Sequence, residues 1–139
     1  MKKYGWISGL LLCQSLAFAQ NTDSLQSLAE SPIGYATVQE AFDALVADPS
    51  ATQSEYEGWT SFNQKVGGRY VIWSFTPQDH PVHPTAVRRE ITNNAGEVLI
   101  SMAVMCHSSR FDCDQLIEQF QQINENLKRK LAGDTGKTR

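Results

Sequence analysis

The sequence predicts an α+β domain: a single antiparallel sheet of four to five strands, with an N-terminal and a C-terminal helix packed on one of its faces. Apolar residues recur at helical spacing after Thr37, and a second helical stripe follows Asp112. Between them, segments 70–75 and 97–106 alternate as strands do. Hairpin and turn signals join the strands and favour antiparallel over parallel pairing.

The first nineteen residues have the three parts of a secretory signal peptide. Two lysines open the segment, residues 6–12 form an apolar core, and Ala-Phe-Ala at 17–19 is a cleavage site. The apolar run is too short to span a bilayer. We expect cleavage after Ala19 and a periplasmic or secreted location; lipidation of Cys13 and an uncleaved anchor are the alternatives.

Charge and hydropathy exclude two classes of partner. Without the signal, ten Lys and Arg residues face fifteen Asp and Glu, so the formal charge becomes −5 in place of −3. An acidic chain is poorly matched to a phosphate backbone, so we expect no nucleic acid as a partner. No second apolar stretch is long enough for a membrane span, so we expect no membrane insertion after signal cleavage.

The domain organisation follows from these composition changes. Residues 1–19 are the signal peptide, 20–34 a polar linker, 35–131 the α+β domain and 132–139 a small, polar and disordered tail. The domain opens with a helix, since Thr37 and Glu40 match a capping box. Asp48-Pro49 ends that helix. Its apolar stripe consists of Val38, Ala41, Phe42 and Leu45.

The strand signals differ in strength. Segments 52–57 and 59–64 are weak, and Gly67-Gly68 then predicts a hairpin turn before the clear strand 70–75. In that strand Val71, Trp73 and Phe75 share one face, while Tyr70 and Ile72 share the other, which indicates cover on both faces. After strand 86–92 and the turn 93–96, apolar residues alternate on a core face: Val98, Ile100, Met102, Val104 and Cys106.

The second helix is predicted from about Asp112 to Lys130, with Asp112 and Gln115 resembling a capping box. Its buried stripe also contains Cys113, and the other members are Leu116, Phe120, Ile123 and Leu127. In an exported chain a disulfide between Cys106 and Cys113 is expected, where it would stabilise the fold by about 2 kcal/mol. Two free buried thiols are the alternative.

Segment 73–89 carries the densest chemistry, beginning with His80 and His83 among prolines. Close histidine pairs bind metals, so His80 and His83, with His107 as a third ligand, form an alternative metal site. Polyproline geometry instead holds residues three apart about 9 Å from each other along the axis. A rigid exposed loop is therefore favoured, and we expect no cofactor.

The segment ends on two arginines. In a strand, Arg88 shares a face with Ala86 and Glu90, while Arg89 points inward with its neighbours Val87 and Ile91. A guanidinium that is buried in this way needs a carboxylate as counter-ion or backbone carbonyls as hydrogen-bond acceptors. It is either a bidentate ligand for an anion or C-terminal carboxylate, or half of an internal ion pair in an edge strand.

No signature of a hydrolase, a zinc protease or a phosphate-binding loop is present, so the sequence does not favour an enzyme. The aromatic residues are either core or a peptide-binding face with the proline loop as its rim. We therefore expect a non-enzymatic binding or accessory module for a protein or peptide. Its candidate binding residues are Trp73, Phe75, His80, His83, Arg88 and Arg89.

The chain also resembles a group of small uncharacterised exported proteins of Gram-negative bacteria. The resemblance rests on Trp-Ser-Phe-Thr-Pro at 73–77, His-Pro-x-His-Pro at 80–84 and Val87 beside a basic residue. Gly58-Trp59 and the two later cysteines also fit. The resemblance covers about residues 35–128. It implies a periplasmic location and a shared fold, and it implies no particular activity.

Overall fold

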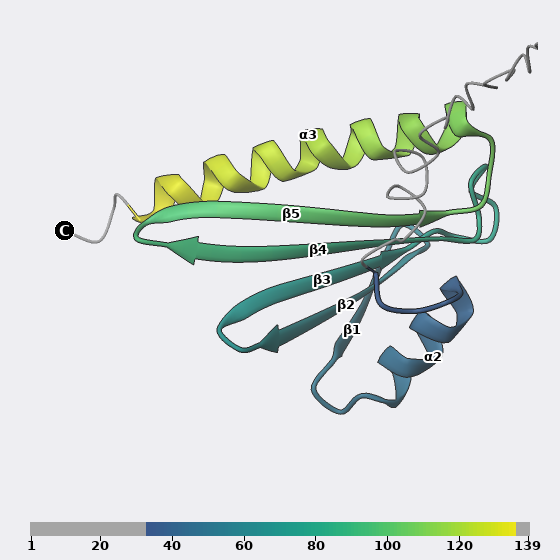
Figure 1. Ribbon diagram of the computed structural model, residues 1–139, viewed down its shortest axis with the longest axis horizontal. Coiled ribbons are helices and arrows are strands. Elements are labelled where there is room, and N and C mark those ends of the chain that lie inside the picture. The colour runs from purple at the N-terminus through teal and green to yellow at the C-terminus, as the bar shows by residue number, and fades with distance from the viewer. Residues whose placement is uncertain (1–32, 136–139) are drawn as a thin grey trace, which may run out of the picture. The chain divides into compact units, whose positions relative to one another are not determined.

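The structure is a computed structural model that describes residues 33–135. The predicted signal peptide and all but the end of the linker lie outside the described residues, as do residues 136–139. The elements are helix α2 (Val38–Ala47), strands β1 (Thr52–Tyr56), β2 (Trp59–Val66), β3 (Arg69–Phe75), β4 (Thr85–Asn94) and β5 (Glu97–Cys106), and helix α3 (Arg110–Thr135) (Figure 1). The strands form one open antiparallel sheet in chain order, which confirms the predicted α+β class.

Two-residue turns make three of the four strand connections. Glu57-Gly58, Gly67-Gly68 and Ala95-Gly96 all have positive φ at both positions. Such turns match the right-handed twist of the strands that they join, and so fix the register of those hairpins. A Cβ atom on Gly58 would lie 3.2 Å from Cβ of Pro77. The fourth connection is loop 76–84, which contains the prolines and both predicted loop histidines.

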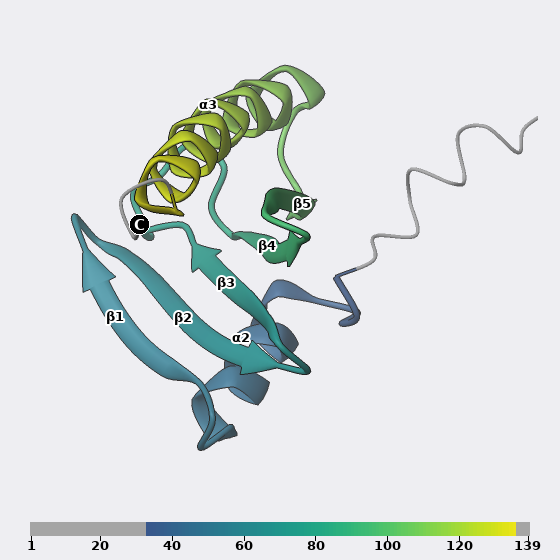
Figure 2. The ribbon, with the colours of Figure 1, turned by 90° about the vertical axis from the view of Figure 1, so that its left-hand side faces the viewer.

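The two helices pack on opposite faces of the sheet, so the expectation that they share one face is wrong (Figures 1 and 2). The physical reason lies in β4, where Ala86 and Val87 are both completely buried although neighbours in a strand point to opposite faces. Ala86 belongs to the apolar cluster under α2, which also includes Ala41, Leu45, Phe62 and Trp73. Val87 belongs to the cluster under α3, together with Leu116, Phe120 and Val82.

Helix α2 begins and ends as predicted. Oγ1 of Thr37 accepts a hydrogen bond from the backbone N–H of Glu40 at 3.1 Å, and Oε2 of Glu40 accepts from the N–H of Ala36 at 3.1 Å. This reciprocal arrangement satisfies two N–H groups at the start of the helix. Asp48 follows as the C-cap. Ile33 is 2% exposed in the same cluster, so the folded region includes the end of the predicted linker.

Helix α3 begins two residues earlier than predicted. Ser109 caps it, because its Oγ accepts from the N–H of Asp112 at 3.1 Å and donates to the Asp112 carboxylate. The spacing Ser-x-x-Asp is itself a capping signal, so the start of the helix after Ser109 could have been predicted from the sequence. The helix continues to Thr135, so residues 132–135, predicted as tail, are helical.

The inner stripe of α3 also differs from the prediction. Leu116 and Phe120 are buried, but Asn124 takes the next inner position and Ile123 is 46% exposed. At about 100° per residue, Asn124 lies roughly 20° around the helix from Cys113, and Ile123 roughly 80°. Asn124 therefore lies nearer than Ile123 to the side of α3 on which Cys113 bonds to β5.

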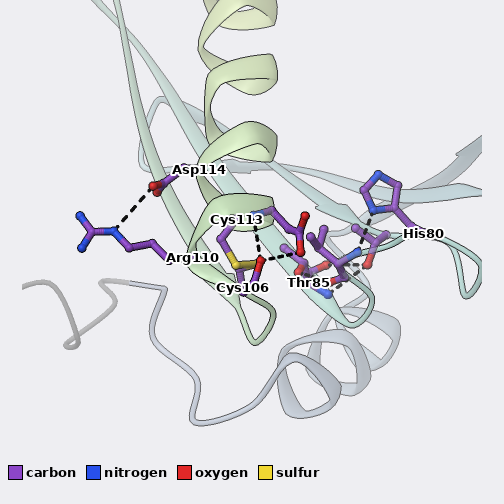
Figure 3. The surroundings of a disulfide bond; sticks show 10 residues. His80, Thr85, Cys106, Arg110, Cys113 and Asp114 are labelled. Atoms are coloured by element: carbon purple, nitrogen blue, oxygen red, sulfur yellow. Dashed lines mark hydrogen bonds and ion pairs between the residues drawn. A yellow bond between two sulfur atoms is a disulfide. The ribbon is translucent and has the colours of Figure 1, made fainter.

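The predicted disulfide joins Cys106, the last residue of β5, to Cys113 in the first turns of α3, with the two Cα atoms 6.0 Å apart. Figure 3 shows His80 and Thr85 on one side of the bond, and the ion pair of Arg110 with Asp114 on the other. The bond therefore fixes where α3 starts relative to the sheet.

Replacing both cysteines by serine should lower the free energy of unfolding by about 2 kcal/mol, because the closed loop restricts the unfolded chain. Urea denaturation followed by circular dichroism measures this. A reducing agent should lower the stability of the unsubstituted protein and leave the doubly substituted one unchanged. Equal stability of the two oxidised proteins would contradict this role for the bond.

Candidate functional site

Two threonines close the base of loop 76–84. The N–H of Thr76 donates to the carbonyl of Thr85 at 3.2 Å, and the N–H of Thr85 donates to Oγ1 of Thr76 at 3.0 Å. Both residues are buried. The loop is thus continuous with the β3–β4 ladder. The sequence prediction missed both residues, although they bracket the proline-rich segment.

The two loop histidines have different environments. Nδ1 of His80 accepts from the N–H of Val82 at 3.3 Å, and its ring lies edge-on to Trp59 at 5.2 Å between centroids. Nδ1 of His83 lies 3.0 Å from the carbonyl oxygen of Thr76. A carbonyl can only accept, so we assign the proton of the neutral His83 ring to Nδ1, which leaves Nε2 as a free acceptor.

The alternative metal site is not formed. His83 and His107 line one cavity, whereas His80 is absent from its wall. Over residues 33–135, no group of three or more His, Cys, Asp or Glu side chains is placed to hold a metal ion. Nδ1 of His80 and Nδ1 of His83 are each engaged by a backbone group, the N–H of Val82 and the carbonyl of Thr76, so neither Nδ1 is left to bind a metal ion.

A cavity of about 580 Å³ lies between loop 76–84 and the start of α2. Phe42 and Phe75 are its aromatic residues, and their rings meet edge to face with centroids 5.1 Å apart. The disulfide loop contributes His107 and the β1–β2 hairpin contributes Gly58 and Thr60, so four segments distant in the sequence meet here. The polar side chains of the wall include Gln39, Gln78, His83, His107 and four threonines.

The predicted aromatic face is mostly core. Trp73 is 4% exposed and stacks on Phe75, and Tyr35 packs edge-on against it. Side chains two residues apart in a strand share a face, and Trp73 and Phe75 lie on the face of β3 that α2 covers, which explains their burial. Phe75 also reaches the cavity wall and Trp73 does not. Of the predicted binding residues, only Phe75 and His83 therefore line this cavity.

The two arginines point to opposite faces, as predicted. Arg88 lies on the α2 face, with its guanidinium 5.8 Å from the ring centroid of Trp73. Nη2 of Arg88 donates to Glu90 at 2.8 Å, and Nη1 of Arg69 donates to the same carboxylate at 2.7 Å. Arg88 is thus already paired with a carboxylate that it shares with Arg69, which weakens it as a ligand for an external anion.

Arg89 lies on the α3 face and is 8% exposed. The alternative of an internal ion pair in an edge strand is wrong, because β4 lies between β3 and β5 and no ion pair of Arg89 occurs among residues 33–135. Nη2 lies 3.5 Å from Oγ of Ser74. Burial lowers the pKa of the guanidinium.

Comparisons with family models, with curated proteins and with solved structures find no match. Neither α2 nor α3 has the length and apolar composition that crossing a membrane requires.

Replacing Glu90 by Gln should destabilise the fold by about 1 kcal/mol at pH 7, since both arginines lose their partner. Burial opposes ionisation of Glu90, but the bonds from Arg88 and Arg69 outweigh it and lower the pKa of the carboxyl below its ordinary 4.5. A carboxyl with a depressed pKa stabilises the fold above its unfolded pKa, and this contribution is lost as pH falls through the folded value.

The difference in unfolding free energy between the unsubstituted protein and E90Q should therefore hold from neutral pH to about 4.5 and shrink at lower pH. Denaturant titrations at several pH values measure it. A difference that stays constant down to pH 2 would show that the charge of Glu90 contributes nothing.

Proposed function

We propose that the protein is a non-enzymatic binding module that holds a peptide, or a segment of another protein, in the cavity between loop 76–84 and α2. The cavity itself carries the proposal. Its volume of about 580 Å³ falls within the roughly 300–1,000 Å³ of ligand sites. Such sites combine apolar walls with a few oriented polar groups, as this one does.

The polar groups of the wall suit a peptide backbone. The amide of Gln78 can donate and accept, Oε1 of Gln39 can accept while its Nε2 donates to Asp43, and Nε2 of His83 accepts. A peptide backbone alternates N–H and C=O groups, which these side chains can bind. Phe42 and Phe75 supply apolar surface for one side chain of the peptide.

Binding is favoured over acid–base chemistry because none of the described residues lining the cavity is acidic. Neither imidazole therefore meets a carboxylate within it. The bond of His83 to the Thr76 carbonyl orients the ring as a fixed acceptor for a ligand N–H or O–H. A fixed acceptor lowers the entropy lost when a ligand binds.

The proposal includes export to the periplasm or secretion. The disulfide between Cys106 and Cys113 supports it, because such bonds persist in oxidising compartments. The signal-like pattern of residues 1–19 supports it independently.

A random-peptide phage library panned on the purified protein should yield peptides that bind in the cavity. Replacing Gln78 by Trp places an indole at the cavity wall, and should weaken their binding by about tenfold or more. Gln53→Trp is the matched control, since Gln53 is also exposed but belongs to β1 and does not line the cavity. Fluorescence polarisation of labelled peptides measures both.

Equal weakening by Q78W and Q53W, or no weakening by either, would place the peptide outside the cavity. His83→Ala should weaken binding more than His80→Ala, because only His83 lines the wall. Melting temperatures of the four variants, compared with that of the unsubstituted protein, show whether a loss of binding reflects a loss of folding.

A further inference from the structure

Arg89 is a buried cation without a counter-ion. Its guanidinium carbon lies 5.2 Å from the ring centroid of Phe120, and its residue is 8% exposed. Within residues 33–135 no carboxylate forms an ion pair with it. Arginine stays protonated in proteins, so the charge persists, and a buried charge is costly unless it is paired. The aromatic ring offers partial compensation.

One edge of the guanidinium is free. Nε is buried and has no hydrogen-bond partner, and Nη2 has the single long contact to Ser74. Nε–H and one N–H of Nη2 lie side by side on the same edge of the planar group. Two parallel N–H groups of this kind match the two oxygens of a carboxylate. The unfilled edge is therefore the one suited to bidentate binding.

A second unfilled group lies in the same layer. Asn124 is 9% exposed, its Oδ1 has no partner, and its Nδ2 lies 3.6 Å from Sδ of Met102. Met102 is directly opposite Arg89 in the β4–β5 register. Asn124 also follows Phe120 by one helical turn. A free acceptor thus accompanies the free donors of Arg89 between α3 and the sheet.

The site can be reached from β3. Arg89 extends toward Ser74 on β3, away from β5. Ile72, opposite Arg89 in the register, is half-buried, and Tyr70 on the same face is 55% exposed. Helix α3 runs along the β4–β5 side of the sheet (Figure 2). Nε of Arg89 and Oδ1 of Asn124 are both buried, so a ligand that approaches over β3 reaches them only once the side chains above them move aside.

We propose that Arg89 and Asn124 bind the carboxylate end of an N-acylated amino acid, the chemical unit that also ends every peptide chain. Nε–H and Nη2–H of Arg89 hold the two carboxylate oxygens, and Oδ1 of Asn124 accepts the adjacent N–H. The ligand supplies the missing negative charge and fills both unpartnered groups. This site is distinct from the cavity, which lies on the other side of loop 76–84 and excludes both residues.

Titration of the ¹⁵N-labelled full chain with N-acetylalanine tests the proposal. The side-chain amide of Asn124 and the backbone amides of Arg89 and Met102 should shift saturably in the millimolar range. N-acetylalaninamide, which lacks the carboxylate, should leave them in place. Acetyl-tetraalanine distinguishes the sources: tighter binding indicates a peptide C-terminus, and equal binding a small N-acyl amino acid.

Arg89→Met should abolish the shifts, and Asn124→Leu should weaken binding several-fold. Arg88→Met is the matched control, because it neighbours Arg89 but points to the opposite face, and it should keep them. Gln78→Trp should also keep them, which separates this site from the cavity. The proposal would be overturned if N-acetylalanine caused no shift, or if N-acetylalaninamide caused equal shifts. Shifts that persist in R89M would also overturn it. If R89M does not fold, the binding affinity of N124L decides.

Discussion

Strand β4 is buried on both faces, and the arrangement of the other elements depends on this. Ala86 and Val87 are consecutive and completely buried, so each face of the sheet needs a cover of its own. Helix α2, which precedes the sheet, covers one face. Helix α3, which follows it, covers the other and starts at the disulfide. The edge strand β1 lies beyond this double cover and is exposed along its length.

The same constraint gives the polar residues of β4 their different environments. Arg88 and Glu90 face the α2 side, where the Glu90 carboxylate pairs with both Arg88 and Arg69. Arg89 faces the α3 side, among Phe120, Ser74 and the neighbourhood of Asn124, where no carboxylate of the described residues reaches it. One strand thus carries an arginine with a carboxylate partner and an arginine without one, side by side. The arginine without a carboxylate partner, Arg89, is the chemical anomaly of the fold.

Local patterns predicted most of the elements. Capping at Thr37, the Gly67-Gly68 turn and alternation in 97–106 each depend on neighbours in the chain, so they could be read directly. The inward position of Arg89 also followed from alternation. The faces of the sheet that the two helices cover could not be predicted in this way, because the length of loop 76–84 leaves the β3–β4 register undetermined. That register places Trp73 opposite Arg88 and not opposite Arg89, so the apolar stripes of β3 and β5 lie on opposite faces.

The candidate sites were harder to predict for the same reason. The cavity joins loop 76–84, α2 and His107, whose proximity depends on tertiary packing. Trp73 was interpreted either as core or as part of a binding face, and it is core, since α2 covers its side of the sheet. Asn124 was missed because the apolar pattern pointed to Ile123, whereas α3 turns Asn124 toward the sheet and leaves Ile123 exposed. These contacts depend on strand register and helix rotation, which no single segment contains.

The central claim is that Arg89 is held between α3 and the sheet with an unpartnered Nε–H. The most direct measurement is hydrogen exchange of the arginine Nε–H groups in the ligand-free protein, followed by ¹⁵N-edited NMR. We predict a resolved Arg89 signal that exchanges far more slowly than that of Arg110, whose side chain is 92% exposed. Exchange of Arg89 as fast as that of Arg110 would contradict the claim, because the guanidinium would then be open to water.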